Sequence, residues 1–498
     1  MALLTILLTA GVLVCTCLGY LVRTVYTHRR KINELRKRGV PMPKEWSWVT
    51  DHLLVLQRYV DKIPPDAAVA FAMRDLSEEY ADEEIFLVDF WPVYPALFTV
   101  FGPNAIEKIC NNLISMNGDE WKYWRSLFNP GFSTGAMLNN VPHIVDSVLV
   151  FREKLIEKIG KGMFSLDEFT TKLTMEVILK VTLDDSSNYQ RAPHILPTAL
   201  GRILSWHSFW DPRILLNPSD PLFREKRLLE IRAAKSSTAS DGQPKAIKSV
   251  ITLALEAYLD EGGNVLDERF AKFAASQIRL FLFAGTDTTA SILVYIYHML
   301  AKHPEWRTKL RQEHDEVFGE RSINAIGLLR EIPSLLDNCK LTLAFIKETL
   351  HCGIEQPMDY AGANVLHQAL HLNPRVWPRA DEFLPERFLV GPEDEMHPDP
   401  AAFRPFEQGP RNCIGQTLVY NELRIAVILT CRDLEIRDAY EDFDRERESQ
   451  LGAWGRWKRT VFGEPLKTLH GDRAYQTDSG GAHPVDGYPC YAKWAKDI

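Results

Sequence analysis

The sequence predicts a mainly α fold with a small β portion, and three observations support this prediction. A long apolar-rich segment, residues 266–301, stops shortly before a proline and has the length of an unusually long helix. A second apolar run, over residues 416–430, also has helical character. Turn-forming residues at 479–481 and 486–487 mark a short β-like region near the C-terminus. The pattern after Pro43 is that of one mostly helical body with short extended pieces.

The composition is that of a large globular protein. The chain has 498 residues, of which 46% are hydrophobic and 25% charged, which is enough for a large core. The formal net charge of -8 argues against a general nucleic-acid binder, so we expect no nucleic-acid partner. Eight cysteines are scattered without metal-knuckle spacing. So few cysteines in a chain of this size do not predict a disulfide framework.

The N-terminus has the pattern of a membrane anchor. Residues 2–22 carry no charge and are just long enough to cross a bilayer as a helix. Basic residues crowd the next sixteen positions, and such clusters stay in the cytosol. A cleaved signal peptide is the alternative, but its basic n-region and cleavage pattern are not evident. We expect an anchor at 1–22, a basic and proline-containing linker at 23–50 and one large cytosolic domain at 51–498.

The loop at residues 406–415 is the most informative part of the sequence. It reads F-x-x-G-x-R-x-C-x-G and presents Cys413 just before a helical run, where the helix dipole favours a thiolate. Two glycines permit a tight turn, an arginine can bind a carboxylate and a phenylalanine can shield the sulfur: Gly409, Gly415, Arg411 and Phe406. A shielded thiolate on such a loop suits an axial ligand of haem iron. An ordinary loop cysteine is the alternative that the loop alone leaves open.

The loop resembles the haem-binding loop of the cytochrome P-450 family of haem-thiolate monooxygenases. Much of the chain from about Pro41 onward is similar to that family, most of all to its membrane-bound fungal members. The resemblance implies the haem-thiolate fold, with haem held by the Cys413 thiolate. It implies an enzyme that uses O2 and takes electrons from NADPH through a partner reductase. It also implies anchoring in the endoplasmic reticulum membrane and a lipophilic small-molecule substrate, as in fungal secondary metabolism.

A second motif, A-G-T-D-T-T at residues 284–289, lies in the middle of the long helical segment. Gly285 and the β-branched threonines weaken the helix there, and the glycine leaves room for a small ligand. Asp287 and Thr288 place a carboxylate beside a hydroxyl. The resemblance implies that this pair delivers protons during O2 activation, while Ala284 and Gly285 lie against haem. A threonine-capped kink in a buried helix is the alternative.

A third motif places Trp121 and Arg125 four residues apart, and therefore on one helix face. An indole N–H and a guanidinium on one face can hold a propionate. The P-450 family has W-x-x-x-R at this place, so the resemblance implies a contact with a haem propionate. An ordinary exposed pair is the alternative.

The fourth motif departs from the family. The family has E-x-x-R, whose arginine bridges the glutamate and the arginine of a P-E-R-F segment and so locks the haem loop. Here Glu348 and Arg387 are present, but His351 stands in place of the bridging arginine. We expect the three-way contact to be lost unless the imidazole is protonated, which would make the lock depend on pH.

Two regions look shorter than in the family: one near residues 112–115 and one between His351 and Gly362. The second would normally hold a strand that lines the substrate pocket. Two other interpretations therefore stay open, a haem-binding but inactive relative and an oxygen-independent thiolate isomerase. Asp287 and Thr288 argue against the isomerase, because that reaction needs no proton delivery.

Overall fold

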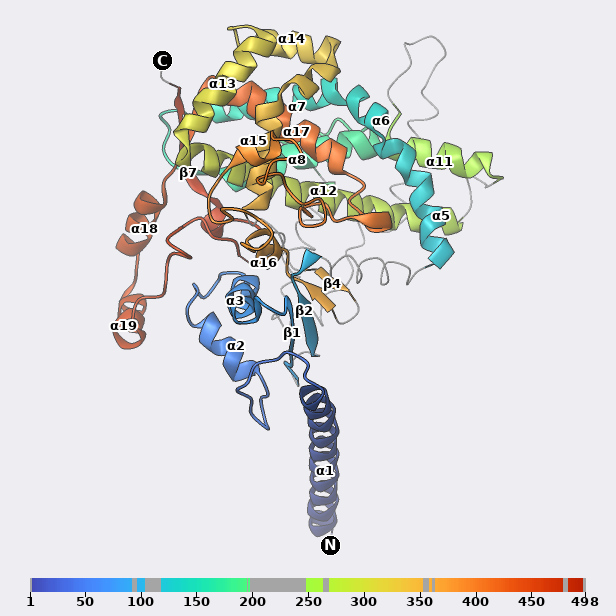
Figure 1. The fold of residues 1–498 in the computed structure, drawn as a ribbon, viewed down its shortest axis with the longest axis vertical. Coiled ribbons are helices and arrows are strands. Elements are labelled where there is room, and N and C mark those ends of the chain that lie inside the picture. The colour runs from blue at the N-terminus through green and yellow to red at the C-terminus, as the bar shows by residue number, and fades with distance from the viewer. Residues whose placement is uncertain are drawn as a thin grey trace.

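The structure is a computed structural model in which the N-terminal helix projects from a mostly helical body (Figure 1). This architecture confirms the predicted mainly α fold with a small β portion. The structure describes residues 2–91, 96–103, 118–194, 196–197, 248–262, 268–352, 358–360, 363–477 and 482–495. The predicted loop at 236–246, the predicted turn at 479–481 and the shortened region near 112–115 lie outside these residues.

Two long helices, α8 (Leu166–Leu183) and α12 (Glu268–Lys302), pack along each other in the middle of the body. α12 matches the long helix predicted from the sequence and ends where Pro304 begins the next helix. The other helices are α1 (Ala2–Lys37), α2 (Leu53–Val60), α3 (Val69–Ser77), α5 (Gly118–Phe128), α6 (Thr134–Asn139), α7 (Val141–Lys158), α11 (Val250–Asp260), α13 (Pro304–Phe318), α14 (Asn324–Glu331), α15 (Lys340–His351), α16 (His367–His371), α17 (Gln416–Thr430), α18 (Tyr440–Ser449) and α19 (Ala453–Phe462).

Two small sheets are present among the described residues. One has the order β1-β2-β5-β4, with β2 and β5 parallel and the other pairs antiparallel. The other is antiparallel and has the order β3-β7-β6. The strands are β1 (Ile85–Val88), β2 (Leu97–Val100), β3 (Phe164–Ser165), β4 (Met358–Tyr360), β5 (Ala363–Val365), β6 (Leu434–Asp438) and β7 (Pro489–Trp494). The turn predicted at 486–487 is present as a 3-10 turn before β7.

The shortened segment after His351 contains a strand, which corrects one expectation from the sequence. β4 pairs with β5 in this segment, with Asp359 opposite Asn364. Three residues are enough for this pairing because each strand needs only a few backbone hydrogen bonds to join a sheet that already exists. The shortening therefore leaves the sheet with a fourth strand.

Gly285 lies where α12 packs closely against α8, which corrects a second expectation. The sequence predicted a weak point in the helix with room for a small ligand. A Cβ atom at Gly285 would instead lie 2.8 Å from Cδ1 of Ile178, so α8 fills this space. Thr174 also donates a hydrogen bond from its hydroxyl to the Thr286 carbonyl, at 3.1 Å. Packing against α8 offsets the roughly 1 kcal/mol that a mid-helix glycine costs, and α12 runs without a break.

The basic segment after residue 22 is the continuation of α1 and is docked on the body. The Arg29 side chain is buried and donates to Asp51 at 2.8 Å and to Asp89. Its other nitrogens bond to backbone carbonyls, among them that of Trp48 at 3.1 Å. A buried charge of this kind is stable only when paired and hydrogen-bonded, so these contacts fix the direction in which α1 leaves the body.

One stretch of the described helices, Leu280–Lys302, is long and apolar enough to cross a membrane. It belongs to α12 and is mostly buried inside the body, as expected of a core helix. The membrane anchor at residues 1–22 stays a prediction from the sequence.

The close approach of α12 and α8 predicts a coupling between Gly285 and Ile178. Gly285→Ala places a methyl group against Ile178, and such overpacking typically costs about 1–3 kcal/mol. Ile178→Ala removes both atoms that lie too close, Cδ1 at 2.8 Å and Cγ1 at 2.9 Å, so the double variant should be more stable than the sum of the two single effects predicts. Urea unfolding of the wild-type protein, the two single variants and the double variant measures this coupling energy. The effect of alanine on helix propensity cancels because it is the same in both variants that carry Gly285→Ala. Strict additivity would contradict the packing described here.

Candidate functional site

The loop that carries Cys413 folds as the sequence predicts, as a tight turn that ends at the start of α17. A 3-10 turn, Gly409–Arg411, precedes the cysteine, and Gly409 has a φ of 78°. This backbone conformation favours glycine because a Cβ atom would clash. The Cys413 amide donates to the Phe406 carbonyl at 2.8 Å, and Gly415 is the N-cap of α17. The turn therefore presents Cys413 at a helix N-terminus.

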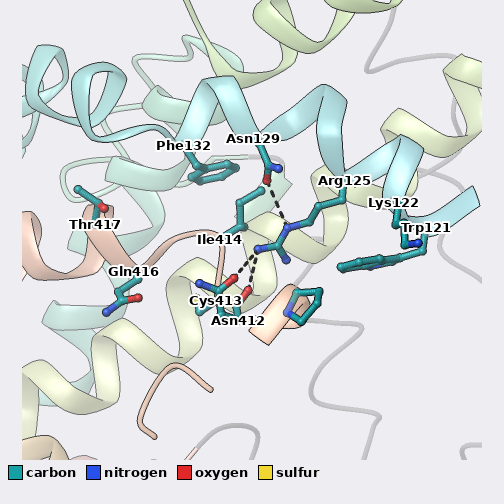
Figure 2. Close-up of a pocket in the computed structure, with 11 residues that line it drawn as sticks. Trp121, Lys122, Arg125, Asn129, Phe132, Asn412, Cys413, Ile414, Gln416 and Thr417 are labelled. Carbon is teal, nitrogen blue, oxygen red and sulfur yellow. Dashed lines mark hydrogen bonds between the residues drawn. The ribbon is translucent and has the colours of Figure 1, made fainter. Parts of the chain in front are cut away.

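A cavity of about 460 Å³ opens beside this turn (Figure 2). Its lining residues come from α5, the 3-10 turn Asn129–Phe132 that follows α5, the cysteine turn and the start of α17: Trp121, Lys122, Arg125, Asn129, Phe132, Pro410, Asn412, Cys413, Ile414, Gln416 and Thr417. Cys413 is exposed and lines this cavity.

Opposing influences act on the Cys413 thiol. Desolvation of the thiol by the surrounding protein raises the pKa of Cys413. The backbone amides of Gly415 and Gln416 donate toward the sulfur, and together with the Arg125 guanidinium they lower the pKa. The net shift is upward, so protein groups alone do not produce a free thiolate. Coordination to a metal ion would supply positive charge at the sulfur and deprotonate the thiol.

The predicted pair on α5 and the arginine of the loop meet at the cavity. Arg125 donates to the Asn412 carbonyl at 2.7 Å and to its side-chain oxygen at 3.1 Å (Figure 2). The guanidinium carbon of Arg411 lies 4.4 Å from the centre of the Trp121 ring, and that of Arg125 lies 5.7 Å from it. Two cations and an indole therefore form one group, suited to bind carboxylates.

Phe406 packs against α17. Its ring centre lies 5.0 Å from that of Tyr420, with the rings edge to face. This contact fixes the start of the loop on the helix that follows Cys413.

Asp287 and Thr288, the carboxylate and the hydroxyl of the A-G-T-D-T-T motif, have different surroundings. Thr288 is exposed on α12, and its hydroxyl donates to the Ala284 carbonyl at 2.8 Å. Ala284 is exposed on the same face. Asp287 points elsewhere, with Oδ1 at 2.9 Å from Nε2 of His483. The sequence motif gave no sign of this histidine, because it follows 196 residues later in the chain.

The Glu348–Arg387 contact is fully buried. Glu348 Oε2 lies 3.0 Å from Nε of Arg387, and the other carboxylate oxygen accepts from the Leu384 amide at 2.7 Å. The two terminal nitrogens of the guanidinium donate to the carbonyls of Pro378 and Arg379, at 3.0 and 3.2 Å. Both charges are thus satisfied, as burial requires.

His351 stands beside this pair without bridging it. Its Nδ1 is 3.6 Å from Glu348 Oε2, and neither ring nitrogen has a hydrogen-bond partner among the described residues. The fully buried ring packs on Trp377, with ring centres 4.1 Å apart. The contact that holds the loop is therefore a pair in this chain and not a three-way contact.

Comparison with known proteins identifies the family. The Cytochrome P450 family model matches residues 107–351 and 361–450. The chain belongs to the cytochrome P450 family. The family match breaks off after His351, where the sequence looked shortened.

Two curated relatives of this P450 are fungal. Cytochrome P450 monooxygenase polC of Polytolypa hystricis is 31% identical over 96% of this chain and 94% of its own length. Cytochrome P450 monooxygenase acrF of Aspergillus aculeatus is 28% identical over 86% of this chain and 98% of its own length. A crystal structure of a cytochrome P450DA heme domain has the same fold, with a TM-score of 0.64 at 18% identity. The structural match covers 92% of this chain and 97% of the P450DA heme domain. The chain is accordingly a P450 monooxygenase.

The cofactor of this P450 is haem, since the family consists of haem-thiolate enzymes, and the described residues fit it. Cys413 is the cysteine that lines the cavity, and two backbone amides are aimed at its sulfur. Cys431 is buried at the other end of α17, with its sulfur 3.5 Å from Nδ1 of His314. The cationic group at Trp121 adds sites for two carboxylates.

The buried pair predicts a large loss of stability when one partner is removed. Arg387→Ala should lower the free energy of unfolding by about 3–5 kcal/mol, because it leaves Glu348 buried and unpaired. Lys309→Ala is the matched control. It removes a 3.0 Å contact to Glu386 on the same segment, but both of its partners are about half exposed, and such pairs contribute roughly 0–1 kcal/mol. Equal losses in urea unfolding would contradict the role given to Arg387.

Proposed function

We propose that this P450 inserts one atom of O2 into a lipophilic small molecule, using electrons from NADPH that a P450 reductase delivers. The observation that carries the proposal is Cys413, presented to the cavity by a glycine turn beside a group of cations. The monooxygenase names of the two fungal relatives support it. The same likeness supports a substrate from fungal secondary metabolism.

In this proposal, residues around the cavity hold the cofactor. Cys413 would hold the haem iron through its sulfur, and the glycine turn would let the backbone approach the cofactor closely. Arg125 and Arg411 bind the propionates, while Trp121 orients both guanidinium groups. Haem, when bound, supplies the activation of O2 and the oxidation itself.

The exposed face of α12 supplies the other wall of the site. Ala284 and Thr288 share this face, which is turned away from α8 because Gly285 and Thr286 make the contacts with that helix. In this proposal the Thr288 hydroxyl holds a proton at Oγ1, and Asp287, the preceding residue on α12, replaces that proton after it is donated.

Membrane attachment is part of the proposal. The uncharged residues 2–22 would cross the endoplasmic reticulum membrane once, with lipid around them and the catalytic body in the cytosol. The Arg29 contacts, which fix the direction of α1, support a body held at a set angle to the membrane.

A second candidate function, a haem binder without turnover, is favoured by one observation. His351 makes no hydrogen bond to a described residue at the position where the family has an arginine. A looser loop would hold haem but not keep the thiolate in place during electron transfer.

Reduction of O2 at the expense of NADPH tests the proposed function without a known substrate. The protein in membranes with added P450 reductase should oxidise NADPH and consume O2. Cys413→Ser should abolish both, because the thiolate is lost, while Cys431→Ser should keep both. A wild-type protein that retains haem but consumes no O2 would support the inactive alternative. With a panel of lipophilic compounds and ¹⁸O-labelled O2, the product should carry one labelled atom.

Thr288→Ala tests proton delivery at the exposed face of α12. The change removes the hydroxyl and leaves the helix contacts with α8 in place, so haem should stay bound. We expect more hydrogen peroxide per NADPH oxidised, since O2 that is not protonated productively leaves as peroxide. An unchanged ratio of peroxide to NADPH would contradict the role of Thr288.

A further inference from the structure

Asp287 belongs to a chain of three titratable side chains from three parts of the sequence. His483, in the C-terminal segment, has Nε2 at 2.9 Å from Asp287 Oδ1. Its other nitrogen, Nδ1, lies 2.6 Å from Oδ1 of Asp167. Asp167 stands in the first turn of α8 and Asp287 in the middle of α12. The imidazole therefore bridges two carboxylates on the two central helices.

The backbone around His483 holds the ring in this position. The Thr477 amide donates to the His483 carbonyl at 3.0 Å. The hydroxyl of Ser291, one helical turn beyond Asp287, donates to the Ala482 carbonyl at 2.5 Å. The segment is thus attached to α12 beside the carboxylate that it contacts, so the ring needs no rearrangement to reach Asp287.

The Asp167 end of this hydrogen-bonded group of three side chains is more exposed to solvent than the Asp287 end. The Asp167 side chain is 21% exposed, whereas those of His483 and Asp287 are 13% exposed. The second carboxylate oxygen of Asp287, Oδ2, is buried and makes no hydrogen bond to a residue in the described part of the chain. One oxygen of Asp287 is therefore occupied by the imidazole and the other is available on the inner side.

The surroundings of His483 favour its charged form. Burial lowers the pKa of the imidazole, but the hydrogen bonds and charges of Asp167 and Asp287 outweigh burial and raise the pKa to about 10. The ring is consequently an imidazolium at neutral pH. The imidazolium carries a proton on each ring nitrogen, and each of these protons is directed at one of the two carboxylates.

We propose that His483 and Asp167 form the outer part of a proton relay that supplies Asp287 from solvent. The relay rests on the proposed function, in which Asp287 and Thr288 deliver protons at the cofactor. One proton passes from Nε2 to Asp287 Oδ1, and the neutral ring keeps its Nδ1 proton. Nδ1–H stays hydrogen-bonded to Asp167, and one proton from water returns to Nε2 and restores the imidazolium. His483 and Asp167 act through Asp287 and are positioning residues.

The same contacts could serve only to attach the C-terminal segment, and a matched variant separates the two roles. His298 also lies on α12 and also contacts a carboxylate of the C-terminal segment, with Nε2 at 2.9 Å from Asp472 Oδ2. Its side chain is 10% exposed, close to that of His483. His298→Gln thus removes a similar contact without touching Asp287.

The first experiment measures the charge of His483 apart from any turnover. A histidine whose pKa is raised on folding contributes stability that is complete below the unfolded value, about 6.5, and is lost as the pH rises through the folded value. The difference in Tm between the wild-type protein and His483→Gln should therefore shrink between pH 6.5 and about 10. A difference that stays constant over this range would overturn the proposal.

The second experiment measures proton delivery in membranes with added P450 reductase, NADPH and O2. His483→Gln should slow NADPH oxidation at least about tenfold, since a positioned acid contributes roughly 10²–10⁴-fold. Asp167→Asn should also slow it, and both changes should increase the solvent deuterium isotope effect. His298→Gln should match the wild-type protein in both measurements.

Two results would overturn the relay while leaving the proposed function in place: a wild-type rate and isotope effect in both relay variants, or an equal loss in His298→Gln. The carbon monoxide spectrum of the reduced protein reports separately on the cofactor. It should show the thiolate ligand in all four proteins. Its absence from the wild-type protein would overturn the proposed function and the relay with it.

Discussion

The buried contact between Glu348 and Arg387 is the interaction on which the rest of the site depends. It joins α15 to the segment that leads to the cysteine turn, and both of its charges are removed from water. Such a pair is stable only if every donor and acceptor is used. Here the Leu384 amide and two backbone carbonyls complete the set. Because the guanidinium binds two successive backbone carbonyls, those of Pro378 and Arg379, the pair fixes the path of the chain before Arg387.

A second contact holds the same loop nearer in sequence to Cys413. Glu407 has a φ of 54° and receives hydrogen bonds from His367 at 2.5 Å and Arg404 at 2.6 Å. Burial raises the pKa of this carboxyl, but the two hydrogen bonds outweigh it and lower the pKa to about 2. The carboxylate therefore stays charged at physiological pH, and its contact does not depend on the protonation of His351.

The sequence predicted the features that depend on local pattern. The Cys413 turn, the long α12 and the shared face of Trp121 and Arg125 follow from glycine positions, helical periodicity and i,i+4 spacing. The contacts between distant segments could not be predicted in this way. The contact of Ile178 with Gly285 and that of His483 with Asp287 join residues more than a hundred positions apart, and no local period records such a neighbour. The expectation of ligand space at Gly285 was wrong for this reason. A glycine in a helix leaves the same gap in the sequence pattern whether a ligand or a neighbouring helix occupies the space.

The central claim is that a two-residue lock keeps Cys413 in place as the haem ligand. The reduced, carbon monoxide-bound difference spectrum of the full-length protein in membranes tests it most directly. We expect a strongly red-shifted Soret band, which arises only when a thiolate remains bound to the iron together with carbon monoxide. An unshifted band from bound haem would contradict it, because the loop would then have released the sulfur.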